Sequence, residues 1–368
     1  MDEYNAYVGL DIHKKTISVA IADAGRTGEC RSYGTIANTS QQLRRLADKL
    51  TQRHGAVHFV YEAGPTGYVA YRTLVEAGHD CAVTGPAQIP KRPGDRVKTD
   101  RRDALQLARL DRAGELDAIW VPDEHHEAIR DLVRAREQAV QDLRRARQRV
   151  SSFLLRHGRF YTGTTWTKTH RRWLARLQFD QPAQKVVLDT LLQAVDQARE
   201  RRDLLSREIA HAVPTWRMAP VVEALKALRG VSLVAAAGVV AEIGDVARFA
   251  HPGQLMAYLG LVSSEHSSGD KRRPGTLTKT GSPLARKLLT EAAWSYRHRP
   301  KISEQQLAQQ EELPQGIRDH AWKAQTRLCA RYRTLIRAGK KPQIAIAAIA
   351  RELVGFIWAI ALQARPAA

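Results

Sequence analysis

Four acidic side chains stand where they could share a metal site. Asp11 lies inside an apolar run that alternates like a β-hairpin, and Glu62 follows the apolar stretch 57–61. Asp100 and Asp103 open a helical pattern. A carboxylate among apolar residues is costly unless it is neutralised, and two divalent cations about 4 Å apart are a common device for cutting phosphodiesters. The set therefore predicts a metal site acting on nucleic acid, although each aspartate alone is equally typical of a turn or a cap.

The elements that must position these carboxylates read as a sheet with helices packed against it. After the opening hairpin the pattern predicts a helix over 40–54, a strand over 57–61, a helix over 68–77, a strand over 81–84 and a helix over 100–113. Such alternation is typical of an α/β domain. Glu62 then lies at the C-terminal edge of its strand. Asp100 and Asp103 share one face of a helix start, where the helix dipole favours negative charge.

Beyond about residue 124 the pattern is helical. Apolar residues recur at helical spacings in two runs: Val133, Val140, Leu143, Val150 and Leu154, then Leu188, Leu192, Val195, Leu205 and Ile209. They predict a coiled-coil-like hairpin, joined by a polar stretch over 157–172, that serves as spacer and assembly element. The rest predicts a mainly α domain with a helix-hairpin-helix-like element, which a plain helical pair explains nearly as well. We expect domains over 1–121, 122–215 and 216–368.

The charge of the chain predicts a polyanionic partner. The 368 residues carry a formal net charge of +20, and the cations are clustered. Trp166 and Trp173, which lie among them, could stack on bases, but core packing is the favoured interpretation. The candidate nucleic-acid contacts are Lys14, Lys15, Arg101, Arg102, Arg144, Arg145, Arg147, Lys168, Arg171, Arg172, Lys271, Arg272, Arg273 and Lys279.

Other features argue against a membrane or secreted protein. No stretch reads as long and charge-free enough to span a bilayer, and the N-terminus lacks a signal-peptide pattern, so we expect a cytoplasmic protein. Cys30, Cys81 and Cys329 form no CxxC pair, which indicates packing residues in a reducing compartment rather than a zinc or disulfide framework.

Four motifs, in this order, resemble the transposases of IS110/IS1111-type bacterial insertion sequences. They are Gly-Leu-Asp-x-His-Lys at 9–14, Glu-Ala-Gly-Pro-Thr-Gly at 62–67, Lys-Thr-Asp-x-x-Asp-Ala at 98–104, and a C-terminal series. That series is Ala-Tyr-Leu-Gly-Leu at 257–261, Ser-Ser-Gly at 267–269 and Lys-Thr-Gly at 279–281. The chain departs from the family pattern at Ser263, where proline is expected. The resemblance covers most of the chain, and the order of the motifs is more specific than any one of them.

The resemblance implies a RuvC-like N-terminal domain of the RNase H fold, with Asp11, Glu62, Asp100 and Asp103 as metal ligands. It also implies a C-terminal transposase domain whose serine nucleophile matches Ser268, or Ser267 if the motif slides by one residue. The implied partners are donor and target double-stranded DNA, a structured non-coding guide RNA, and a homodimer that assembles into a tetramer on DNA. Mg²⁺, two per site, is the metal expected from oxygen ligands, and Mn²⁺ is the alternative.

A serine hydroxyl needs activation before it attacks, and a metal acting as Lewis acid on the phosphate would supply it. The product would be a phosphoserine-linked strand, and the helical hairpin would let one subunit's serine meet another's metals. One alternative is a RuvC-like junction nuclease that uses water; another is a non-catalytic nucleic-acid-binding protein. An actin-like ATPase is less supported, because no second phosphate loop follows. His13 and His266 could assist proton transfer or contact phosphate, but the favoured interpretation of each is a surface or hydrogen-bonding histidine.

Overall fold

The computed structural model describes residues 4–90, 99–265 and 273–365. The chain divides into two compact units, Met1–Val121 and Pro122–Ala368. The first alternates strands with helices, and the second, where described, is helical apart from one short hairpin. A mixed α/β region followed by a helical region is therefore confirmed. The further division of the second unit at residue 215 stays a prediction.

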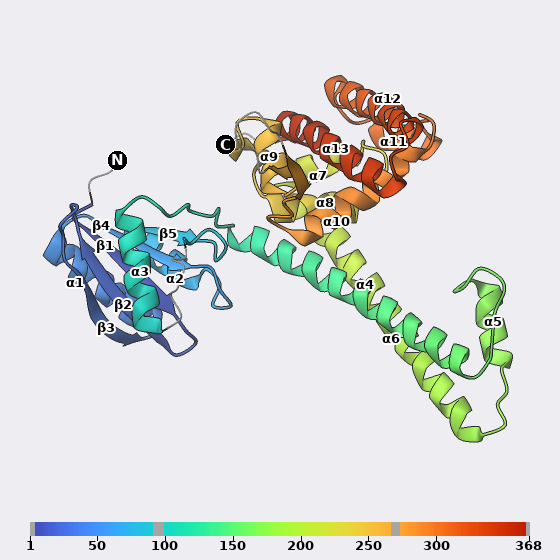
Figure 1. The fold of residues 1–368 in the computed structure, drawn as a ribbon, viewed down its shortest axis with the longest axis horizontal. Coiled ribbons are helices and arrows are strands. Elements are labelled where there is room, and N and C mark those ends of the chain that lie inside the picture. The colour runs from blue at the N-terminus through green and yellow to red at the C-terminus, as the bar shows by residue number, and fades with distance from the viewer. Residues whose placement is uncertain (1–3, 91–98, 266–272, 366–368) are drawn as a thin grey trace. The chain divides into compact units, whose positions relative to one another are not determined.

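The first unit is built on one five-stranded mixed sheet (Figure 1). The strands are β1 (Ala6–Ile12), β2 (Thr16–Asp23), β3 (Cys30–Ala37), β4 (Val57–Glu62) and β5 (Asp80–Thr84), in the order β3-β2-β1-β4-β5. β1 pairs antiparallel with β2 and parallel with β4, and β4 pairs parallel with β5. The C-terminal ends of β1 and β4 therefore meet at the same edge of the sheet.

β3 is a strand that the sequence pattern did not reveal. Its polar and apolar side chains do not alternate, and all are partly or fully exposed, because the strand lies at the edge of the sheet and pairs with β2 alone. Main-chain hydrogen bonds define this strand, and no apolar alternation marks it.

Helices α1 (Ser40–His54) and α2 (Val69–Glu76) cover one face of the sheet, close to their predicted bounds. Alternate strand residues such as Leu10 and Phe59 join them in a hydrophobic core with Leu50. Helix α3 (Asp100–Arg112) contacts β1 and β2 from the other face. There the buried layer is made of small side chains, Ala20, Ala22, Ala104 and Ala108, so this helix packs closely.

The second unit begins with two long helices lying side by side (Figure 1). α4 (Glu124–Arg156) and α6 (Pro182–Ala212) bury most of the predicted apolar positions, among them Leu143, Val150 and Leu188. Within the predicted polar connection the structure has a further helix, α5 (Lys168–Arg176), at the far end of the pair. Its N-cap Thr167 accepts a hydrogen bond from the amide of His170, and we had not predicted a helix from this capping signal.

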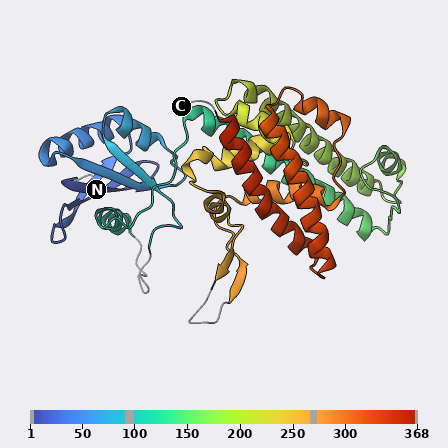
Figure 2. The same ribbon diagram turned by 90° about the horizontal axis from the view of Figure 1, so that it is seen from above.

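The remaining helices form one large core. They are α7 (Ala219–Leu225), α8 (Leu233–Ile243), α9 (Pro252–Tyr258), α10 (Pro283–Ala293), α11 (Glu304–Gln310), α12 (Gln315–Arg337) and α13 (Pro342–Ala364), with short 3₁₀ helices at Val213–Thr215, Val246–Arg248 and Trp294–Arg297. Two short antiparallel strands, β6 (Ser263–Glu265) and β7 (Pro274–Leu277), project from these helices (Figure 2). The sequence pattern did not predict these strands.

Of the helices that the structure describes, α13 alone is long and apolar enough to cross a membrane. By that criterion our expectation that no such stretch exists is wrong. Half of its most apolar window is buried inside the second unit, where Leu353, Val354 and Ile357 are at most 2% exposed. A core helix passes the same test of length and composition, and the burial of α13 accounts for its hydrophobicity.

Candidate metal centre

Gly9, Asp11 and His13 follow a period of two, which places them on the same face of β1 and its extension. That face is covered by α3. A Cβ atom at Gly9 would lie 2.2 Å from the carbonyl oxygen of Ala104 and 2.6 Å from the amide nitrogen of Ala108. Only glycine leaves room for a helix backbone at this distance. The Gly-Leu-Asp-x-His spacing therefore sets Asp11 just beyond the point where the helix touches the strand.

Asp100 reaches the same place from α3. Ala104 lies at the contact just described, and Asp100 is one turn earlier on the same side of the helix. Asp100 lies four helical residues from the contact, a rise of about 6 Å, and Asp11 lies two strand residues from it, a rise of about 6.6 Å. The two carboxylates therefore lie at nearly the same distance from the contact. Thr99 caps the helix by accepting a hydrogen bond from the amide of Arg102, which fixes this first turn.

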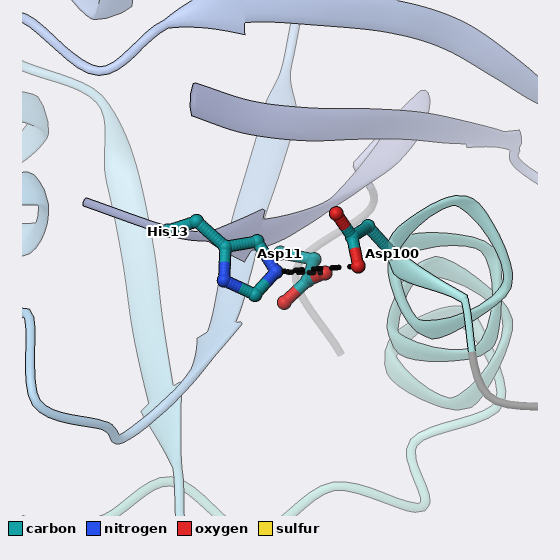
Figure 3. Close-up of side chains that lie close together, drawn as sticks. All are labelled: Asp11, His13 and Asp100. Atoms are coloured by element: carbon teal, nitrogen blue, oxygen red, sulfur yellow. Dashed lines mark hydrogen bonds and ion pairs between the residues drawn. The ribbon is translucent and has the colours of Figure 1, made fainter. Parts of the chain in front are cut away.

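Asp11, His13 and Asp100 come together in the structure (Figure 3). Nε2 of His13 lies 3.1 Å from Oδ2 of Asp11 and 3.4 Å from Oδ1 of Asp100. One ligand atom from each of the three lies within 4.8 Å of the others. Oxygens bound to one Mg²⁺ at 2.0–2.1 Å are at most about 4.2 Å apart, so this donor set fits a divalent cation with little movement. Asp11 is the deepest of the three, with its side chain 20% exposed.

Strand register puts Glu62 on the same face and at the same edge of the sheet as Asp11, but Glu62 is not one of the three described residues whose ligand atoms come together. Asp11 and Glu62 directly follow the last paired positions of the parallel strands β1 and β4, and register neighbours share a face of the sheet. His58, four residues earlier on β4, shows which face this is, because its Nδ1 lies 2.7 Å from Oδ2 of Asp111 in α3. Glu62 is exposed, at the C-terminal edge of the sheet as predicted.

Asp103 is partly buried on α3 and acts on Asp11 electrostatically. Burial is the largest influence and raises the pKa of Asp11. The imidazole of His13 lowers that pKa, whereas the negative charges of Asp100 and Asp103 raise it, and the net shift is upward. Ionising Asp11 therefore costs more free energy in the folded protein than in the unfolded chain, and a bound cation would offset that cost.

Predicted phosphate contacts flank these carboxylates. Lys14 and Lys15 lie exposed in the turn between β1 and β2, and Arg101 and Arg102 lie exposed in the first turn of α3. Cations in such positions can hold a nucleic-acid backbone without reading its sequence.

In the second unit, two predicted contacts on α4 line one pocket. Arg144 and Arg147 share it with Arg136, Arg202 and Lys287, and these five cations outnumber the two glutamates of the lining. Burial lowers the pKa of Arg147, and the charge of Arg202 lowers it further. Among the described residues, neither Arg144 nor Arg147 has a carboxylate partner. The pocket therefore carries positive charge that no protein group described by the structure neutralises.

Trp166 and Trp173 pack against the cluster between α4 and α6, as expected. The guanidinium of Arg147 lies 5.1 Å from the ring centroid of Trp166, and that of Arg171 lies 5.7 Å away. Arg171 is also ion-paired with Asp196. The other predicted contacts of this region are all exposed: Arg145, Lys168 and Arg172.

Two glycine motifs close the base of the β6–β7 hairpin. Gly260 has a φ of 64°, and a Cβ atom there would lie 2.3 Å from the amide nitrogen of Thr280. Gly281 has a φ of 66°, and its Cβ atom would lie 2.2 Å from the carbonyl oxygen of Tyr258. Both positions need glycine for the backbone conformation and for the close approach. The motifs at 257–261 and 279–281 therefore bring the two ends of the hairpin together.

Arg286 of α10 holds the same base. Its Nη1 lies 3.2 Å from the carbonyl oxygens of Leu259 and Gly281 and also contacts the carbonyl oxygen of Thr280. Arg273 and Lys279, both predicted nucleic-acid contacts, are exposed. Five residues singled out in the sequence lie outside the described part of the chain: His266, Ser267, Ser268, Lys271 and Arg272.

His13 also lies at this centre. The structure confirms an exposed, hydrogen-bonding histidine, with Nε2 3.1 Å from Oδ2 of Asp11. What the sequence did not reveal is the second carboxylate, Asp100, whose Oδ1 lies 3.4 Å from the same nitrogen. The available signal for the first contact was the spacing of two from Asp11 at the end of a strand, which keeps both side chains on the same face.

Two family models match this chain. The DEDD-type model of IS110, described as a transposase, matches residues 8–158. The model described as the transposase IS116/IS110/IS902 family matches residues 222–307, which include the base of the β6–β7 hairpin.

Full-length relatives carry the same description. A protein of Sinorhizobium fredii named as transposase y4qE is 49% identical over 365 residues, which are 99% of this chain and 90% of the relative. The transposase for insertion sequence element IS1533 of Leptospira borgpetersenii is 31% identical over 344 residues, which are 91% of this chain and 98% of the relative. A solved structure of Thermus thermophilus RuvC covers 31% of this chain and 99% of its own at 11% identity, but the TM-score of 0.23 is too low to support an argument.

The chain joins a mixed α/β unit with converging carboxylates to a helical unit, and relatives named as transposases match nearly its whole length. Together these findings define an insertion-sequence transposase. The chain belongs to the IS110 family of these enzymes.

Proposed function

We propose that this transposase cuts and rejoins donor and target DNA at a metal centre made by Asp11, Glu62, Asp100 and Asp103. The observation that carries the proposal is the approach of Asp100 to Asp11, which a glycine contact between strand and helix sets up. The RuvC-like RNase H fold and a pair of Mg²⁺ ions, with Mn²⁺ as a substitute, belong to the same proposal. Bound there, the ions would polarise the scissile phosphate.

The nucleophile we propose is Ser268, with Ser267 as the alternative. The serine Oγ forms a bond to phosphorus, the bond from phosphorus to a sugar oxygen breaks, and the proton leaves with that oxygen. The reverse reaction with a new strand end rejoins the DNA without ATP. The closed base of the β6–β7 hairpin supports this role, because the motif at 267–269 falls in sequence between these two strands.

The proposed partners are DNA, a structured non-coding guide RNA and further copies of this chain in a dimer that assembles into a tetramer. The cations Arg144 and Arg147, which no described carboxylate neutralises, support a polyanionic partner. We propose that the α4–α6 hairpin is the assembly element and that a serine of one subunit serves the metals of another. A bacterial cytoplasmic location follows from the proposed substrate.

A cleavage assay tests the metal centre. Full-length protein, the element's RNA, labelled DNA and Mg²⁺ are compared for wild type, Asp11→Asn, Asp100→Asn and Asp48→Asn. Asp48 is the matched control, because it also pairs with a histidine, His79, but lies on α1, which covers the face of the sheet opposite to α3. We expect cleavage to fall at least a hundredfold in the first two variants and on chelation, and to persist in Asp48→Asn. Undiminished cleavage by Asp11→Asn would overturn the proposal.

A further inference from the structure

His13 differs from the other histidines of the first unit in the number of carboxylates that it meets. His58 pairs with Asp111 at 2.7 Å, and His79 pairs with Asp48 at 3.0 Å. In the described part of this unit, His13 alone has Nε2 within 4 Å of two different carboxylates. An ordinary histidine–aspartate pair is therefore common in this unit, and a histidine shared by two converging carboxylates is not.

The main chain of His13 is fixed on both sides. Its amide donates a hydrogen bond to the carbonyl oxygen of Thr16 at 2.8 Å, and its carbonyl oxygen accepts one from Nδ2 of Asn38 at 2.7 Å. These contacts hold the turn after β1, and the ring points towards Asp11 (Figure 3). The side chain is still 51% exposed, so the ring lies on the solvent side of the carboxylates, where it could contact a bound ion.

We propose that Nε2 of His13 is a direct ligand of the cation that Asp11 and Asp100 hold. The inference rests on the metal centre proposed above and adds a nitrogen to a site expected to use oxygen alone. Nε2 lies 3.1 and 3.4 Å from the two carboxylate oxygens. Neighbouring ligand atoms are this far apart when each lies about 2.1 Å from the same ion. The ring shifts the preference of the site from Mg²⁺ towards Mn²⁺, because Mg²⁺ is a harder cation that takes oxygen ligands, whereas Mn²⁺ accepts an imidazole nitrogen more readily.

The neighbouring histidines provide matched controls. His58→Gln removes an imidazole that also contacts an aspartate but lies outside the centre. His13→Gln removes the proposed nitrogen and keeps a side chain of similar size. His13→Asp replaces the nitrogen with a carboxylate oxygen, which should retain an ion and shift preference towards Mg²⁺. Thermal unfolding of each variant establishes that it is folded before metal is added.

The experiment measures Mn²⁺ binding to metal-free, full-length protein. Titration calorimetry gives the affinity, and pulsed electron paramagnetic resonance detects nitrogen coordinated to the ion. Wild type and His58→Gln should bind Mn²⁺ at the centre with a ¹⁴N coupling from a coordinated imidazole. In His13→Gln the coupling should disappear and Mn²⁺ affinity should fall about tenfold, whereas Mg²⁺ affinity should change less than threefold. His13→Asp should lose the coupling while still binding the ion.

Asp11→Asn separates failure of this inference from failure of the centre. If Asp11→Asn abolishes binding but His13→Gln keeps both the nitrogen coupling and the affinity, the centre stands and His13 is not a ligand. His13 is also excluded as a ligand if wild type binds Mn²⁺ without any nitrogen coupling. If Asp11→Asn binds Mn²⁺ as wild type does, the ion lies elsewhere and the proposed centre itself is wrong.

Discussion

Gly9 of β1 and Ala104 of α3 approach so closely that a methyl group on Gly9 would lie 2.2 Å from the carbonyl oxygen of Ala104. This contact fixes how far along the strand the helix sits. Since Asp11 is two residues beyond it and Asp100 one helical turn before Ala104, the contact also determines whether the two carboxylates meet.

Gly9→Ala should therefore damage the centre without touching a carboxylate. The methyl group must push α3 away, because the atoms that it meets most closely belong to the backbone, and overpacking of this kind costs about 1–3 kcal/mol. We expect a lower free energy of unfolding and at least tenfold weaker Mn²⁺ binding. Gly64→Ala is the control, since a Cβ atom there would meet only one atom within 4 Å, at 3.9 Å. Wild-type metal affinity in Gly9→Ala would refute this role of the contact.

Asp11→Asn should stabilise the metal-free protein at neutral pH. The pKa of Asp11 is raised above its unfolded value of 3.8, so ionising it costs the folded state free energy. That cost is absent below pH 3.8 and grows as the pH rises from there through the folded pKa. In chelator, the melting temperature of the variant should exceed that of wild type at pH 7, and the difference should shrink as the pH falls towards 4.

Added Mg²⁺ should reverse that order, because an ion bound only by folded wild type stabilises it and leaves Asp11→Asn unaffected. Asp48→Asn is the control for an aspartate whose charge faces a histidine. An Asp11→Asn variant that melts below wild type in chelator at pH 7 would contradict the electrostatic explanation.

Arg147→Ala should weaken nucleic-acid binding and flatten its salt dependence. Arg147 lines the cationic pocket without a carboxylate partner in the described part of the chain, so a phosphate is its natural counterion. For duplex DNA, the slope of log affinity against log salt should become less negative by about 0.9 for one lost phosphate contact. Arg145→Ala should do less, because Arg145 already pairs with Asp142 at 3.0 Å. Equal slopes for both variants would contradict the pocket as a binding site.

Arg286→Ala should loosen the base of the β6–β7 hairpin and leave the helical core folded. The lost contacts join a guanidinium to three carbonyl oxygens, and a hydrogen bond to a charged group is worth about 1.5–3 kcal/mol. Hydrogen exchange should rise for amides over 257–262 and 276–281 and stay unchanged in α13. Arg297→Ala, on an exposed arginine of the same unit, is the control. Unchanged exchange at the hairpin base would show that Arg286 does not hold it.

Local signals explain what the sequence predicted well. Helix α1 runs over the predicted 40–54, because its apolar spacing is regular and Thr39 caps it. The edge strand β3 and the β6–β7 hairpin were missed, because their side chains are largely exposed and main-chain pairing leaves no apolar pattern. The expectation that no stretch could span a membrane failed at α13, because burial in a core favours apolar residues as a membrane would.

At the metal centre, too, the sequence predicted some features and not others. Asp11, Glu62, Asp100 and Asp103 could be chosen from residue types and strand ends, and the family pattern connected them. The contact that brings Asp100 to Asp11 could not be predicted, because it depends on a glycine meeting a helix distant in sequence. The approach of His13 to a second carboxylate could not be predicted for the same reason, since Asp100 lies on α3.

Covalent trapping of DNA on the protein distinguishes a metal-assisted serine nucleophile from water. Full-length protein, the element's RNA, labelled donor and target DNA and Mg²⁺ are resolved on a denaturing gel for wild type, Ser268→Ala, Ser267→Ala and Asp11→Asn. We expect a protein–DNA adduct that is lost in Ser268→Ala and Asp11→Asn and kept in Ser267→Ala. Metal-dependent cleavage without an adduct in any lane would contradict the proposed mechanism and identify a hydrolase that uses water.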